Sequence, residues 1–145
     1  MFAMKSSLVG LVLAAIIWLP AGAAEIFPGP VEAKVLRVID GDTFVAEALV
    51  WPGHSVRVAV RIRGIDAPEM RSRCPAEKQA ARRSRAVLSR LIGEGPVRIT
   101  AIGGGKYYGR VLADVADARG RAVAAKMLRL GMARPYDGGR REAFC

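Results

Sequence analysis

Hydrophobic and polar positions alternate most regularly between Val56 and Arg63, where every second residue is valine or isoleucine. A period of two is typical of a strand with one buried face, and it puts Arg61 on the face opposite Val60 and Ile62. Four other segments are short, apolar and bounded by turn residues, which also indicates strands. They are Val31–Ile39, Thr43–Val50, Val97–Ile102 and Arg110–Val115.

Two segments favour helices. The first begins at Pro75, which suits a first helical turn, and ends before Gly93, Gly95 and Pro96. Its expected apolar stripe consists of Ala76, Ala80, Val87, Leu88 and Leu91. The second runs from about Val123 to Leu130 and ends at Gly131, a favourable C-terminal cap. The remaining tail, 134–145, contains Pro135 and a Gly-Gly pair and is predicted to be irregular.

This order of elements predicts the α+β class. Five strands, interrupted by one helix and followed by another, favour a five-stranded antiparallel barrel of the OB-fold type with two to three helices. The chain of 145 residues has the length of one domain and shows no internal repeat. We therefore expect a single folded domain at 25–145.

The first residues have the features of a secretory signal peptide. Lys5 precedes a short apolar run, Leu8–Leu19, which is followed by Pro20 and an Ala-Gly-Ala site. We expect residues 1–24 to be the leader, cleaved after Ala23 or Ala24, and the protein to be periplasmic or secreted. The alternative is a membrane anchor, although a spanning helix needs about 20 apolar residues.

Charge and cysteine content narrow the class further. Lys and Arg number 23 against 13 Asp and Glu, a formal net charge of +10, which favours a polyanionic partner such as nucleic acid or an anionic membrane surface. Cys74 and Cys145 are the two cysteines. In an exported protein an even count predicts a disulfide, and two free thiols are the alternative.

Four acidic residues lie at predicted strand ends in this basic chain. Asp40 and Asp42 flank a glycine after the first strand, and Asp66 and Glu69 follow the third. Carboxylates held close together need a compensating cation or proton, and hard oxygen ligands suit calcium or magnesium. The alternative is an ordinary turn, because Asp and Gly favour turns in general.

Three blocks of sequence resemble the thermonuclease family, also called staphylococcal nuclease-like. They occur in order, and with a weaker match at Val123–Ala133 the similarity covers nearly all of Val31–Ala133. The blocks are Val38-Ile-Asp-Gly-Asp-Thr43, Val60-Arg-Ile-Arg-Gly-Ile-Asp-Ala-Pro-Glu69 and Tyr108-Gly-Arg-Val-Leu-Ala113.

The resemblance implies a calcium-dependent endonuclease that hydrolyses phosphodiester bonds of DNA and RNA to 3′-phosphate products. Calcium would be bound by the carboxylates of Asp42 and Asp66 and by the backbone carbonyl of Ala67, with Asp40 in the outer shell. Glu69 would hold the attacking water. Two arginines would bind the scissile phosphate and a tyrosine would lie beside the nucleotide, namely Arg61, Arg110 and Tyr108.

The sequence departs from the family pattern in ways that bear on substrate choice. Ala67 stands where threonine is common, and Lys106-Tyr107 replaces the usual Asp-Lys before the Tyr-Gly-Arg block, so Lys106 and Tyr107 join the expected substrate-binding residues. A monomer without stable protein partners is expected. The alternative function is a non-catalytic OB-fold nucleic-acid-binding protein, but acids in a phosphate-binding groove repel the ligand unless a metal bridges them.

Overall fold

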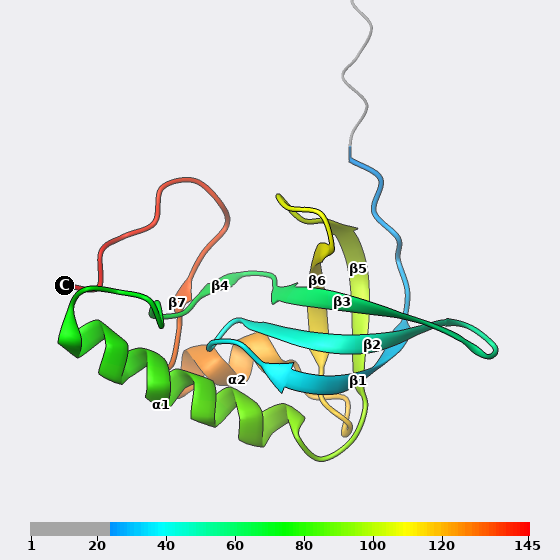
Figure 1. The fold of residues 1–145 in the computed structure, drawn as a ribbon, viewed down its shortest axis with the longest axis horizontal. Helices are drawn as coiled ribbons and strands as arrows, with labels where there is room; N and C mark the ends of the chain where they lie inside the picture. The colour runs from blue at the N-terminus through cyan, green and yellow to red at the C-terminus, as the bar shows by residue number, and fades with distance from the viewer. Residues whose placement is uncertain (1–23) are drawn as a thin grey trace, which may run out of the picture.

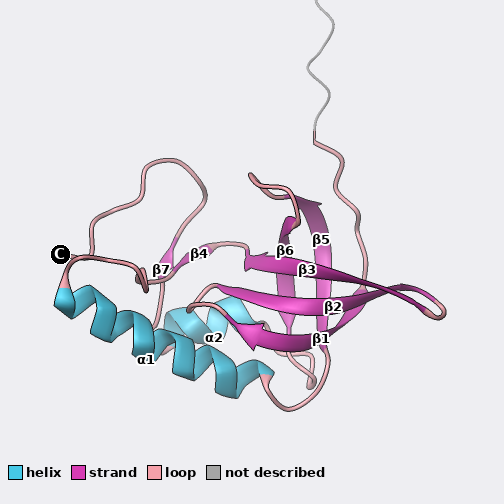
Figure 2. Ribbon diagram, viewed as in Figure 1, coloured by secondary structure: helices cyan, strands magenta, loops and turns pink. Residues whose placement is uncertain are grey.

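The computed structural model describes residues 24–145, so the predicted signal peptide lies almost entirely outside the described residues and stays a prediction. Figures 1 and 2 show a small barrel with both helices on one side of it. The barrel strands are β1 (Val31–Val38), β2 (Thr43–Trp51), β3 (His54–Ile62), β5 (Val97–Gly104) and β6 (Arg110–Ala116). The helices are α1 (Pro75–Ile92) and α2 (Val123–Arg129).

The barrel closes in the order β1-β2-β3-β6-β5, which confirms the OB-type architecture and the α+β class. One detail of the prediction is wrong: the sheet is mixed, because β3 and β6 pair in parallel. All other neighbours are antiparallel. A closed ring of five strands cannot alternate direction at every seam, so one seam must be parallel. This seam pairs Arg61 with Leu112 and Ala59 with Arg110.

The core lies inside the barrel and beneath α1. Phe44, Val60, Ile62 and Leu88 are completely buried, so the inward face of the alternating strand is the one predicted. Helix α1 is rotated relative to the expected stripe. Its buried residues are Ala81, Ser84, Leu88 and Ile92.

Two short strands were not predicted. Strand β4 (Ile65–Asp66) pairs antiparallel with β7 (Arg134–Pro135), so the predicted irregular tail is wrong at its first two residues, while residues 136–145 contain no helix or strand. The pairing places the start of the tail beside Asp66.

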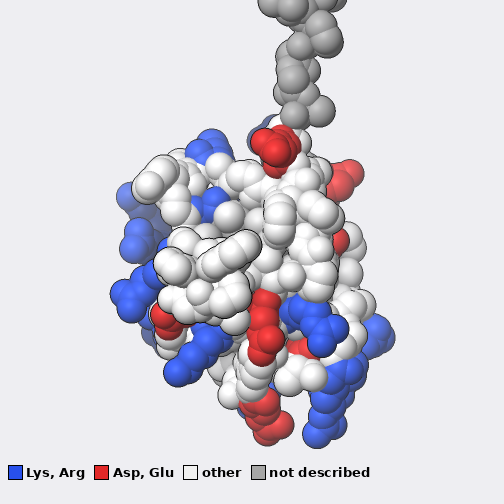
Figure 3. All heavy atoms as spheres, turned by 90° about the vertical axis from the view of Figure 1, so that its right-hand side faces the viewer, with Lys and Arg blue, Asp and Glu red and all other residues white. Residues whose placement is uncertain are grey.

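The hairpin of β2 and β3 extends beyond the barrel (Figure 1). Trp51 at its tip is 69% exposed, and several other large apolar side chains near this end are also exposed. Figure 3, which views the molecule from this side, shows a broad uncharged area with Lys and Arg side chains on either side of it. Within residues 24–145, no helix has the length and apolar character needed to cross a membrane.

A buried carboxylate stabilises the turn after β6. Asp117 accepts hydrogen bonds from the backbone amides of Arg119 and Arg121, both at 2.9 Å, and pairs with the Arg121 guanidinium at 2.8 Å. Burial opposes ionisation, but these donors outweigh it and lower the pKa of Asp117. Other charged residues lining the adjoining pockets are Arg90, Glu94, Lys126 and Arg129.

Candidate active site

The loop between β1 and β2 packs directly on α1. A Cβ atom added at Gly41 would overlap the Ser84 hydroxyl and would lie 2.8 Å from the Cβ of Ala67. Ser84 is fully buried and donates a hydrogen bond to the Met132 carbonyl at 2.7 Å. Gly41 is therefore a close-approach position, and the Asp-Gly-Asp segment is not an ordinary exposed turn.

This close approach joins the two acidic segments. The Asp42 carboxylate accepts a hydrogen bond from the Ala67 amide at 2.7 Å and one from the Thr43 hydroxyl at 2.8 Å. The Asp42 carbonyl accepts one from the Ile62 amide at 2.8 Å. Asp42 and Asp66 are each only 4% exposed, so both carboxylates are buried and need polar partners.

Asp40 lies behind Asp42. Its Oδ1 accepts a hydrogen bond from the Asp42 amide at 3.0 Å. Burial, together with the neighbouring charge of Asp42, raises the pKa of Asp40 to about 7. Asp40 therefore supports the backbone of Asp42, and its outer-shell role stays a prediction.

Arg61 supplies positive charge to both buried aspartates. Its Nη2 lies 3.3 Å from Asp42 Oδ2 and 3.4 Å from Asp66 Oδ1. Its Nη1 donates to the carbonyls of Ile62 at 2.9 Å and Ile65 at 2.7 Å. With 18% of its side chain exposed, Arg61 is fixed against the site and retains an accessible edge.

The sequence did not point to Arg141, which lies in the middle of the site. Its Nη2 is 2.6 Å from Asp66 Oδ1 and 3.3 Å from the Ala67 carbonyl, and its Nη1 pairs with Glu69. Burial opposes the charge of this guanidinium, but the hydrogen bonds to Asp66 and Glu69 dominate and raise its pKa. The only signal in the sequence was Cys145, four positions later, whose disulfide returns the tail to the site.

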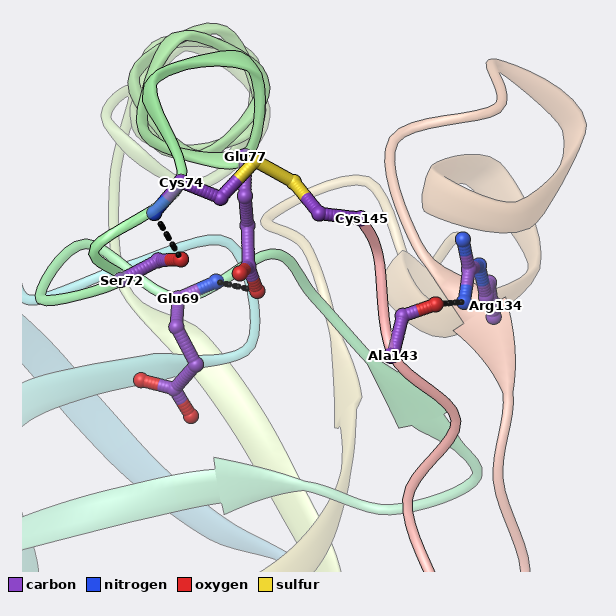
Figure 4. Close-up of a disulfide and its surroundings, with 7 residues drawn as sticks. All are labelled: Glu69, Ser72, Cys74, Glu77, Arg134, Ala143 and Cys145. Atoms are coloured by element: carbon purple, nitrogen blue, oxygen red, sulfur yellow. Dashed lines mark hydrogen bonds between the residues drawn. A yellow bond between two sulfur atoms is a disulfide. The ribbon is translucent and has the colours of Figure 1, made fainter.

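Cys74 and Cys145 form the expected disulfide, with 6.5 Å between their Cα atoms. Cys74 immediately precedes α1, and Glu77 in the first turn of this helix accepts a hydrogen bond from the Glu69 amide at 3.0 Å. Figure 4 shows the bridge, Glu69 and Glu77 around this end of the helix. The disulfide therefore anchors the last residue of the chain close to the candidate site.

The structure does not bring Arg110 into contact with the carboxylates. Its guanidinium lies 5.8 Å from the centre of the Tyr107 ring, and Lys106 Nζ lies 5.7 Å from the same ring. Tyr108 is completely exposed. The register nevertheless places Arg110 on the outer face of the β3–β6 seam, two positions along from Arg61.

The oxygen atoms at the site suit a hard cation. These oxygens already bind cationic groups in the free protein. A guanidinium nitrogen lies within 3.4 Å of each of Asp42, Asp66 and the Ala67 carbonyl. No group of three or more His, Cys, Asp or Glu residues in the described part of the chain forms a metal cluster. Two carboxylates and one carbonyl would leave other positions to water, which calcium tolerates. The metal-binding roles stay predictions.

Comparisons with known proteins agree with the resemblance seen in the sequence. Curated proteins gave no match to this chain. A family model described as staphylococcal nuclease homologue matches residues 59–143. The match begins within β3 and includes Arg61, Asp66, Glu69 and Arg110, and it continues through most of the tail. Since the matched segment is more than half of the chain, the protein belongs to the staphylococcal nuclease homologue family.

Proposed function

We propose that this protein is a calcium-dependent endonuclease that hydrolyses phosphodiester bonds of DNA, RNA or both and leaves 3′-phosphates. One observation carries the proposal: in a member of this family, two buried aspartates share the Arg61 guanidinium, and one of them, Asp66, shares the Arg141 guanidinium with the Ala67 carbonyl. When bound there, calcium would neutralise phosphoryl oxygens and favour an attacking water. Asp42, Asp66 and the Ala67 carbonyl would hold it.

Glu69 would be the residue that acts on water. It follows Ala67 by two positions, and its backbone amide is fixed by Glu77 at 3.0 Å while its carboxylate faces the site. The backbone of Glu69 is thus held in place while its carboxylate stays partly exposed to solvent. Such a carboxylate can accept a proton from a water molecule or orient that water for attack.

The two predicted arginines would act on the phosphate. Arg61 lies beside the two aspartates, and it would donate to a phosphoryl group by exchanging some of the contacts that its two Nη atoms make in the free protein. Arg110 would reach the same phosphate from β6 by leaving the Tyr107 ring. Negative charge grows on the phosphoryl oxygens in the transition state, so donors aligned with them stabilise it more than the bound substrate.

The setting of the enzyme is also proposed. A cleaved leader at 1–24 would deliver the domain to the periplasm or the medium, where the Cys74–Cys145 disulfide persists. The expected form is a monomer. Fractionation of expressing cells, with N-terminal sequencing of the product, would give Ala24 or Glu25 as the first residue; a retained leader would contradict export by cleavage.

The function is tested by digestion of plasmid and of RNA with calcium, with magnesium, and with a chelator. We expect cleavage with calcium alone, because magnesium demands near-octahedral geometry that two carboxylates and a carbonyl supply poorly. New ends should accept polymerase extension only after phosphatase treatment, as 3′-phosphates require.

Asp42→Ala is the matched control, since it removes a proposed ligand and retains the basic surface. Cleavage that persists after exhaustive chelation, or in this variant, would refute the calcium mechanism. Nucleic-acid binding without cleavage under every condition would instead support the non-catalytic binding protein.

A further inference from the structure

The guanidinium of Arg141 occupies the space between groups that the proposed function assigns to calcium and water. Its Nη2 contacts Asp66 Oδ1 at 2.6 Å and the Ala67 carbonyl at 3.3 Å, and its Nη1 pairs with Glu69. Calcium takes oxygen ligands at about 2.3–2.6 Å, and Asp66 and the Ala67 carbonyl are two of the oxygens that would hold it. The ion and the Arg141 guanidinium therefore cannot bind these two oxygens at the same time.

The part of the tail that follows β7, residues 136–145, is fixed at both ends. At its start the Tyr136 amide donates to the Gly64 carbonyl at 2.9 Å, directly after the β4–β7 pairing. At its end Cys145 is bonded to Cys74. Figure 1 shows the tail leaving β7, looping outward and returning to the start of α1.

A further contact holds the returning half of the tail. Arg134, in β7, donates to the Ala143 carbonyl at 3.1 Å, and its guanidinium lies 3.8 Å from the centre of the Phe144 ring. Figure 4 shows Arg134 beside Ala143 and the bridged Cys145. Arg141 is thus presented to Asp66 from a loop that is held at both ends and by Arg134 near its end.

Charge explains why this contact forms and why it can be exchanged. Asp66 is buried, and a buried carboxylate needs a compensating cation. Arg61 is mostly buried and also bonded to two carbonyls, whereas 41% of the Arg141 side chain is exposed. Arg141 is therefore the more accessible of the two partners of Asp66. A divalent ion that supplies the compensating charge can displace Arg141 and leave Arg61 in place.

We propose that Arg141 is a tethered internal cation that competes with calcium for Asp66 and the Ala67 carbonyl, and that the Cys74–Cys145 disulfide keeps it there. The proposal rests on the proposed function for the identity of the ion. A short tether holds its end group at an effective concentration of about millimolar, so the tail lowers the apparent affinity for calcium. Release of the tail opens the cation site.

The test is calorimetric titration of calcium into the oxidised protein, without nucleic acid. Arg141→Gln should bind calcium roughly three- to fivefold more tightly than wild type, the upper part of the range expected when a partly exposed ion pair is removed. Cys145→Ser should also bind more tightly, but by less, because Arg141 remains in a looser tail. Arg141→Lys, which keeps the charge without the fork, should lie between wild type and Arg141→Gln.

Arg140→Gln is the matched control for net charge. Arg140 is exposed and forms no hydrogen bond or ion pair with another described residue, so this variant should bind calcium within twofold of wild type. Equal affinities of wild type and Arg141→Gln, or an equal gain in Arg140→Gln, would overturn the proposal. An absence of calcium binding in every variant would overturn it as well.

Cleavage assays on the same variants separate this proposal from the proposed function. Tighter calcium binding by Arg141→Gln without any cleavage would support the competing cation and refute the nuclease. Calcium-dependent cleavage with unchanged affinity in Arg141→Gln would refute the competing cation and retain the nuclease. Circular dichroism of each variant verifies that the barrel is folded.

Discussion

Replacing Gly41 by alanine should disrupt the site by steric overlap alone. The φ angle of Gly41 is not in the left-handed region, so the backbone accepts alanine. The added methyl group would meet the Ser84 hydroxyl, and the Cβ atoms of Ser84 and Ala67 would both be 2.8 Å away. Overpacking of this kind costs about 1–3 kcal/mol. Because Ser84 is buried in α1 and Ala67 is bonded to Asp42, we expect the upper end of that range.

The assay is urea unfolding of a double-mutant cycle. Ser84→Ala alone loses the hydrogen bond to Met132 and should cost about 1 kcal/mol. In that background Gly41→Ala should cost less, by about 0.5–2 kcal/mol, since the worst overlap is gone. The relief is partial because the Ser84 and Ala67 Cβ contacts remain.

Gly104→Ala is the matched control, because nothing lies within 4 Å of the added atom and its φ angle is ordinary. It should change the free energy of unfolding by no more than about 0.5 kcal/mol. Two results would show that α1 does not pack tightly on the loop between β1 and β2. One is that Gly41→Ala lowers the free energy of unfolding no more than this control does, and the other is that Ser84→Ala fails to reduce the cost of Gly41→Ala.

Three further outcomes are expected. Arg110→Lys should leave binding of a short single strand nearly intact at fixed salt and should lower single-turnover cleavage by about 10²–10³, unrescued by excess calcium; cleavage within a few-fold of wild type would make Arg110 a binding residue only. Cys145→Ser should lower the free energy of unfolding, by at most about 4 kcal/mol for a bridge spanning 71 positions; two alkylatable thiols in the unreduced, unfolded wild type would contradict the bridge. Asp117 has a lowered pKa, so its contribution is present above its unfolded pKa of about 3.9 and is lost as pH falls through the lower folded value. Asp117→Asn should accordingly destabilise the protein at pH 7 and progressively less below pH 4 in urea unfolding; a cost independent of pH would exclude the ionised carboxylate as its source.

The sequence carried enough information to predict the barrel strands because their burial repeats locally. The alternation from Val56 to Ile62 reports a strand with one buried face, and its position was nearly correct. A parallel seam follows from closing a ring of five strands, but the alternation within each strand does not specify that it lies between β3 and β6. The stripe on α1 was misplaced because a polar residue, Ser84, occupies the buried face.

The site was predictable to the extent that its residues lie at strand ends. Asp42, Asp66 and Arg61 meet as expected, because the loop after β1 is pressed against the segment after β3. Arg110 begins a strand, as predicted, but its guanidinium lies beside the Tyr107 ring and not beside the carboxylates. The role of Arg141 depends on a tail without periodicity and on a disulfide, neither of which specifies a side-chain position in the sequence.

Two arginines together explain how a site rich in acids folds before a cation binds. Arg61 belongs to the barrel, and its bonds to backbone carbonyls make it a permanent partner of Asp42 and Asp66. Arg141 belongs to the tail, and it contacts the same Asp66 oxygen as Arg61 does. Removing one partner of a buried ion pair is costly unless another cation takes its place. Calcium would do so, and it stabilises the native state according to its apparent affinity. The stabilisation by calcium should therefore be smaller with Arg141 in the site than after its replacement by glutamine.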